Sequence, residues 1–122
     1  MYYSSITEEG YKIKLSIAPL EEDWPSKLED YGTVLERGSD TFDFVYLDEE
    51  SCFLAFTIDE RMSKNASLQV YQSSDGITFE ETDINIPLQA NAHNSGVSKH
   101  LDGHISYNDK LYICYAFSET NE

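Results

Sequence analysis

The chain has 122 residues, is 40% hydrophobic and 13% aromatic, and carries a formal net charge of −15. This length fits one ordinary domain with a single core, and the composition is typical of a folded chain. The negative charge would repel a phosphate backbone, so no nucleic-acid partner is expected. It is compatible with a neutral sugar, a cation or a basic protein, or with solubility alone. No apolar run approaches the roughly 18 residues of a membrane span, so no membrane partner is expected either.

The first segment, MYYSSITEEGYK, has no basic stretch followed by an apolar one, so no signal peptide is predicted. The location of the protein stays unknown, and it is cytoplasmic if this start is native. The two cysteines, Cys52 and Cys114, lie in apolar strand-like runs without CxxC spacing. We therefore expect both to be small buried residues rather than zinc ligands or redox groups.

The first clear strand is YKIKLSI, in which Ile13, Leu15 and Ile17 alternate with polar side chains. The segment after it, PLEEDWPSKLEDYG, is the one candidate for a helix, but Pro19 and Pro25 interrupt it. No segment of 12 or more residues has helical periodicity. Alternation and β-branched or aromatic residues predict four further strands, at residues 44–48, 52–58, 68–73 and 79–86.

This strand pattern repeats along the chain. YKIKLSIAPLEEDW aligns on ASLQVYQSSDGITF at an offset of 55 residues, which places Ile13 on Leu68. FVYLDEESCFLAF aligns on GHISYNDKLYICYAF at an offset of 59, which matches the turn DEES with the turn YNDK. The repeat units expected are residues 1–41, 42–101 and 102–122.

A repeated four-stranded unit of about 55 residues is the signature of a β-propeller blade. The fold predicted is therefore all-β, a partial β-propeller of four-stranded antiparallel blades, with about two blades in a single domain spanning residues 1–122. An antiparallel sandwich or meander is the alternative. Because propellers close with roughly four to eight blades, we expect either a homo-oligomer or missing blades in a longer parent chain.

The turn SSDGITF resembles a shortened Asp-box, the Ser-x-Asp-x-Gly-x-Thr-Trp turn of sialidases and related β-propellers. Five-bladed glycosidases of the arabinanase and β-xylosidase type carry a similar Ser-x-Asp-Gly followed by Trp or Phe. We expect Asp75 to accept backbone hydrogen bonds, Gly76 to adopt a positive φ and Phe79 to pack under the blade. In the families that it resembles, this turn lies far from the active site, so we expect a structural corner.

The resemblance also implies where catalysis would occur. In these glycosidases carboxylates stand at the starts of the innermost strands, and Asp43 and Asp102 occupy such positions here. Glycoside cleavage needs an acid and a base or nucleophile roughly 5 to 9.5 Å apart. We therefore predict Asp43 and Asp102 as the catalytic pair, with turn capping before a strand as the alternative.

The segment KHLDGHIS places His100, Asp102 and His104 at alternate positions, on one side of an extended chain. His100 and His104 could then ligate zinc or another transition metal, whereas the resemblance implies an axial calcium or other ion with a histidine nearby. We predict His104, His93 and Tyr107 as sugar-contacting residues. The alternatives are that the histidines are polar strand ends and that the tyrosines pack between blades.

The function predicted first is that of a glycoside hydrolase-like, carbohydrate-active β-propeller, completed by oligomerisation or cut from a larger enzyme. The alternative is a non-catalytic, lectin-like carbohydrate-binding or assembly module. Whether the protein is an enzyme, which sugar it takes and how many subunits it has are left open by the sequence.

Overall fold

The computed structural model describes residues 1–36 and 41–119. Within these residues the chain is all-β, with a single-turn 3₁₀-helix and no α-helix, which confirms the predicted class. The chain divides into two compact units, unit 1 (Met1–Asp40) and unit 2 (Thr41–Glu122). This division falls one residue before the end of the first predicted repeat unit. No helix among the described residues has the length and apolar character needed to cross a membrane.

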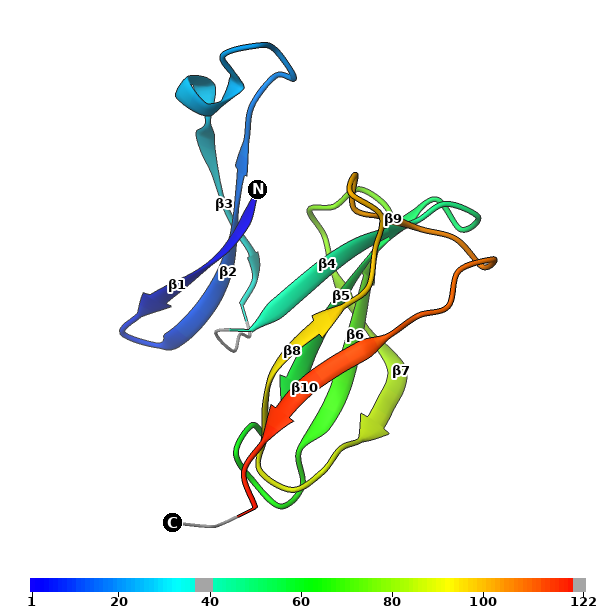
Figure 1. Ribbon diagram of the computed structural model, residues 1–122. Coiled ribbons are helices and arrows are strands. Elements are labelled where there is room, and N and C mark those ends of the chain that lie inside the picture. The colour runs from blue at the N-terminus through cyan, green and yellow to red at the C-terminus, as the bar shows by residue number, and fades with distance from the viewer. Residues whose placement is uncertain (37–40, 120–122) are drawn as a thin grey trace. The chain divides into compact units, whose positions relative to one another are not determined.

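Unit 1 is an antiparallel meander of β1 (Tyr2–Thr7), β2 (Gly10–Ile17) and β3 (Glu29–Leu35) (Figure 1). Ile13 and Leu15 of β2 are buried as predicted, whereas Ile17, at the end of the strand, is exposed. The long β2–β3 connection contains the 3₁₀-helix η1 (Trp24–Lys27), with Pro25 in its first turn, where the missing proline N–H is tolerated.

Unit 2 contains a five-stranded sheet of order β7-β6-β5-β4-β9 and a separate two-stranded sheet, β10-β8. Strands β4 to β7 pair antiparallel in chain order, as predicted, and β9 pairs parallel with β4. The strands of the larger sheet are β4 (Phe42–Leu47), β5 (Cys52–Asp59), β6 (Ser67–Ser73), β7 (Glu80–Pro87) and β9 (His104–Ile105). Those of the smaller sheet are β8 (Ala92–Val97) and β10 (Ile113–Phe117).

The core of unit 2 lies between these two sheets, because β8 packs over β4 and β5 (Figure 1). Alternate residues of each strand point toward β8 and β10, as the pleat of a strand requires. Leu68 and Val70 of β6 are buried, like Ile13 and Leu15 at the aligned positions of β2. The buried cluster consists of Val45, Leu47, Cys52, Phe56, Leu68, Val70, Val97 and Ile105.

Strand β8 is not among the strands predicted from the sequence. Its sequence, AHNSGV, contains Asn, Ser and Gly, which are poor strand formers. The strand forms because Ala92 and Val97 enter the core and because β10 pairs with it. Tertiary packing here overrides local propensity.

The first strand of the third repeat unit is shorter than its alignment on β4 implies. It shortens to the two residues of β9, because Gly103, at φ +84°, closes a turn before it and a second turn spans Ser106 to Asp109. Instead of opening a new blade, β9 joins the edge of the existing sheet beside β4. The prediction that both cysteines are buried holds for Cys52 but not for Cys114, which is exposed on β10.

The Asp-box-like turn between β6 and β7 has the predicted local structure. Gly76 has φ +74°, and the ring of the half-buried Phe79 packs edge-on against Phe44, with centroids 5.7 Å apart. The Asp75 carboxylate accepts hydrogen bonds from Ile77 N (2.8 Å), Thr78 N (2.8 Å) and Ser73 Oγ (2.9 Å). These backbone and hydroxyl donors hold the pKa of Asp75 below its usual value, and the Thr78 N–H has the largest effect.

Candidate functional site

The first predicted catalytic residue, Asp43, has both carboxylate oxygens engaged. Oδ2 accepts a hydrogen bond from Val97 N at 2.8 Å, and Oδ1 forms an ion pair with Lys99 and accepts from Phe44 N. The Lys99 ammonium also donates to the Phe44 carbonyl at 3.1 Å. Asp43 therefore ties β4 to the end of β8 and to the segment that follows it.

The second predicted catalytic residue, Asp102, lies in the turn that Gly103 closes. Its exposed carboxylate accepts a hydrogen bond from His104 N at 3.0 Å, which is the turn-capping role given above as the alternative. Asp43 and Asp102 thus come from different settings, a strand and a turn, and have separate hydrogen-bond partners.

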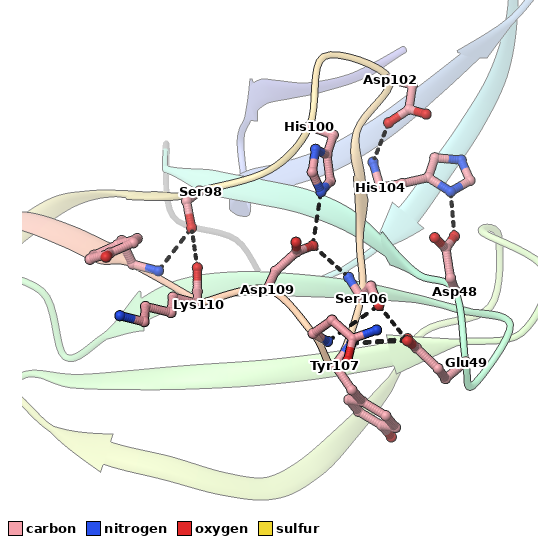
Figure 2. Close-up of polar contacts among 12 residues, drawn as sticks. Asp48, Glu49, Ser98, His100, Asp102, His104, Ser106, Tyr107, Asp109 and Lys110 are labelled. Atoms are coloured by element: carbon pink, nitrogen blue, oxygen red, sulfur yellow. Dashed lines mark hydrogen bonds and ion pairs between the residues drawn. The ribbon is translucent and has the colours of Figure 1, made fainter.

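The connection between β8 and β10, residues 98–112, is the 98–112 loop, and it is held by an acidic turn between β4 and β5. This acidic turn consists of Asp48, Glu49 and Glu50, and each of its carboxylates binds the loop. The turns DEES and YNDK, aligned on each other in the sequence, therefore lie against each other (Figure 2). The contacts are Asp48 Oδ1 with His104 Nδ1 (2.5 Å), Glu49 with Ser106 Oγ and with Tyr107 N (3.1 Å), and Glu50 Oε1 with Tyr107 OH (2.5 Å).

These contacts change the acidity of the groups involved. The Asp48 carboxylate raises the pKa of His104 above its usual value, while the Ser106 hydroxyl holds the pKa of Glu49 low. Glu50 raises the pKa of Tyr107 to about 12. Tyr107 is therefore protonated at neutral pH, and it acts as a hydrogen-bond donor rather than as a base.

The predicted metal ligands His100 and His104 have different carboxylate partners. His100 Nε2 lies 2.9 Å from Asp109 Oδ2, whereas His104 binds Asp48. The positive φ of Gly103 breaks the alternation that would have placed His100, Asp102 and His104 on one side. Within residues 1–36 and 41–119, no group of three or more His, Cys, Asp or Glu side chains is arranged to hold a metal ion.

The Asp109 carboxylate organises the turn after β9. Its Oδ2 also accepts a hydrogen bond from Ser106 N at 2.8 Å. The hydrogen bond from Ser106 N has the larger effect and the contact with His100 the smaller one in holding the pKa of Asp109 below its usual value. Figure 2 shows His100, Asp109 and Ser106 linked in one chain of polar contacts.

Of the three predicted sugar contacts, two lie in the 98–112 loop. Tyr107 has 64% of its surface exposed, and the ring of His104 packs against Tyr46 with centroids 4.9 Å apart. His93 lies near the start of β8, where its Nδ1 is 3.0 Å from the Asn91 carbonyl. It is therefore at the end of β8 remote from the loop.

A cleft of 250 Å³ lies within the 98–112 loop. The two ends of the loop are held together where β8 ends and β10 begins. There Ser98 N donates to the Tyr112 carbonyl at 2.9 Å, and Ser98 Oγ accepts from Tyr112 N at 2.8 Å. The lining residues are Ser98, Lys99, His100, Ile105, Ser106, Asp109, Lys110, Leu111 and Tyr112.

Of these lining residues, His100 alone was predicted as a site residue, and Lys110 and Tyr112 add two further polar groups. Neither the Lys110 ammonium nor the Tyr112 hydroxyl has a hydrogen-bond or ion-pair partner in the described part of the chain, and Tyr112 is 61% exposed. No local signal in the sequence could have brought them together, because their place in the cleft depends on the pairing of β8 with β10, which joins Ser98 to Tyr112 across the loop.

Comparison with known proteins identifies no relative: no family model, curated protein or solved structure matches the chain. The resemblance to β-propeller glycosidases and sialidases therefore depends on the strand repeat and on the Asp-box-like turn. The function of the chain has to be inferred from the side chains of its own site.

Proposed function

We propose that the chain is a carbohydrate-binding module of β-propeller type, with the sugar bound in the cleft of the 98–112 loop. The observation that carries the proposal is this cleft, because it is lined by an amine, a phenol and an imidazole, of which the first two have no partner among the residues that the structure describes. A concave site with a few convergent polar groups is the usual form of a small-ligand site.

The architecture of unit 2 supports the propeller type. Strands β4 to β7 form a four-stranded antiparallel meander, and the turn between its third and fourth strands is the Asp-box-like one. A second sheet, β8 with β10, packs on the face of this meander, as neighbouring blades do.

The chemistry of the cleft suits a polyol. Lys110 can donate up to three hydrogen bonds and Tyr112 can both donate and accept one, which matches the mixed character of sugar hydroxyls. The exposed rings of Tyr112 and Tyr107 offer apolar faces with a polar end, suitable for the apolar face of a sugar ring. The carbohydrate class itself comes from the resemblance.

Binding without cleavage is favoured by the state of the two predicted catalytic residues. Hydrolysis needs one carboxyl group to give a proton and another to activate water or attack the sugar. Asp43 is paired with Lys99 and with Val97 N, and Asp102 caps a turn. Neither residue lines the cleft.

The proposal is tested by screening the protein on a glycan array and measuring affinity for the best ligand by calorimetry. Tyr112→Ala should weaken binding about three- to tenfold, through the loss of ring contact and one hydrogen bond. Lys110→Ala should weaken it by a similar factor. Tyr31→Ala is the matched control, because Tyr31 is 52% exposed on β3 in unit 1, and it should bind as the wild type does. Absence of binding to any glycan would refute the proposal.

Hydrolysis is measured in parallel with chromogenic glycosides. We expect no turnover by the wild type. Turnover that Asp43→Asn and Asp102→Asn both abolish, with folding intact, would instead establish the protein as a glycosidase with this catalytic pair.

A further inference from the structure

Strand β10 combines an apolar sequence with an exposed position. Residues 111–118, LYICYAFS, contain no charged residue, although the chain has a net charge of −15. Tyr115 is 36% and Phe117 is 46% exposed on one face of the strand, and Cys114 is exposed on the other. An exposed apolar segment of this kind marks an interaction surface.

The outer edge of β10 is open. β8 is its one strand neighbour among the described residues, so no described strand pairs with the backbone groups of the opposite edge. Uncharged edges of this kind are templates for pairing with another strand, and proteins usually protect edges with charge. Two other edge strands have that protection: β7 contains Glu80, Glu81 and Asp83, and β3 begins with Glu29 and Asp30.

This open edge is also regular. The pairing of β10 with β8 passes from Ser95 to His93 between Tyr115 and Ala116, so Asn94 is an extra residue on β8. Asn94 has φ +52° and takes up the irregularity. Because the bulge lies on β8, β10 keeps its alternation along its whole length.

We infer that β10 pairs antiparallel with β10 of a second copy of this chain, around a twofold axis at Tyr115. In this register Ile113 lies opposite Phe117 of the second copy, and Cys114 lies opposite Ala116. Each aromatic and β-branched pair is a favourable cross-strand contact, and the symmetry repeats it. The product is a continuous antiparallel sheet, β8-β10-β10-β8, with as many strands as the β4–β7 meander.

Self-complementarity and charge select a second copy as the occupant. Two chains of charge −15 repel each other, and this repulsion is smallest where an uncharged strand meets its own copy. β1 is also uncharged, but Ser4, Ser5 and Thr7 make half of it hydroxylic, so it buries less apolar surface. The inference is independent of sugar binding.

The inference is tested by light scattering on the full chain over a range of micromolar concentrations. We expect a monomer–dimer equilibrium in which the dimer fraction rises with added salt, because salt screens the repulsion. Tyr115→Glu brings two carboxylates together at the axis and should weaken dimerisation at least about a hundredfold. Ile84→Lys is the matched control, because Ile84 is 48% exposed on the edge strand β7, and it should dimerise as the wild type does. A wild type that stays monomeric, or a Tyr115→Glu variant that still dimerises, would overturn the inference.

The register is tested by disulfide cross-linking. Ala116→Cys places the new thiol opposite Cys114 of the second copy, so mild oxidation should give a covalent dimer. Adding Cys114→Ser to this variant removes the partner thiol and should abolish that product. Efficient cross-linking of the wild type through Cys114 alone would place Cys114 rather than Tyr115 on the axis and overturn the register.

Discussion

Two connections in unit 2, the Asp-box-like turn and the 98–112 loop, are stabilised in opposite ways. The turn is held by Asp75, which bonds donors two or three residues away. The loop is held by Asp43 and by the acidic turn, whose partners are 54 to 58 residues distant in the sequence. The first connection is therefore a local structure, whereas the second depends on the correct packing of β8 on the sheet.

This difference explains why the turn behaves as a corner and the loop forms a cleft. The polar groups of the turn satisfy one another, with Ser73 Oγ also accepting from Gly76 N at 2.9 Å. The loop is fastened by the acidic turn through His104, Ser106 and Tyr107, whereas the side-chain polar groups of Lys110 and Tyr112, which line the cleft, have no partner among the described residues. Groups without internal partners are the ones that can bind a ligand.

The largest effect is expected from Asp43→Ala, which removes the anchor at the start of the loop. Val97 N–H loses its acceptor and Lys99 loses its ion-pair partner, and an unsatisfied donor costs about 1 to 3 kcal/mol. We expect unfolding in urea to show a loss of about 2 kcal/mol, with faster amide exchange at Val97. Asp43→Asn keeps one acceptor and should lose less. Wild-type stability in the alanine variant would show that the loop does not depend on this anchor.

A smaller effect is expected from Gly76→Ala in the turn. At φ +74° an alanine is strained, so the free energy of unfolding should fall by about 1 kcal/mol. Gly96→Ala is the control, because a Cβ at Gly96 would meet the Asp43 carboxylate at an ordinary 3.9 Å. It should leave stability within about 0.5 kcal/mol of the wild type. An equal loss in both variants would contradict the role given to the turn.

The pH dependence of the turn should be that of a carboxylate with a depressed pKa. Since the folded-state pKa of Asp75 lies below 3.8, its charge stabilises the fold above this value, and the contribution is lost as the pH falls through the folded-state pKa. Denaturation of the wild type and of Asp75→Asn should therefore differ at pH 6 and converge in strong acid. A difference that does not change with pH would indicate that the charge of Asp75 contributes nothing.

The loop should show the opposite dependence, through His104. Because Asp48 raises the pKa of His104 above 6.5, the contact is at full strength below that value and is lost as the pH rises through the folded-state pKa. We expect NMR titration of the His104 ring to show a midpoint above that of His104 in Asp48→Asn. Amide exchange in the loop should increase with this titration beyond the intrinsic pH effect. Coincident midpoints would rule out the His104–Asp48 contact in solution.

The same local and long-range distinction decides what could be predicted from the sequence. Strands β4 to β7 and the geometry of Asp75 and Gly76 were predictable, because alternation and turn chemistry are local signals. β8 was not predictable, since AHNSGV becomes a strand through packing and pairing alone. The cleft that brings Lys110 and Tyr112 together was missed for the same reason.

The positional equivalence assumed for Asp43 and Asp102 is also not found, for the same reason. Asp43 and Asp102 were matched by an offset of 59 residues, which assumed that a new blade opens at residue 103. In the structure β9 instead joins β4 in parallel, so the two aspartates lie in a strand and a turn. A sequence offset can detect repeated strands, but it does not specify which sheet each strand joins.

The bonds from Asp43 and Glu49 to the 98–112 loop also bear on the order of folding. They close chain segments of 54 and 57 residues, and the loss of chain entropy on closure has to be compensated by contacts that do not yet exist in the early chain. The hairpins of β4 to β7 require only short closures. The meander should therefore be in place before the loop is fastened, so that the 98–112 loop is the last part of unit 2 to form and the first to open when the protein unfolds.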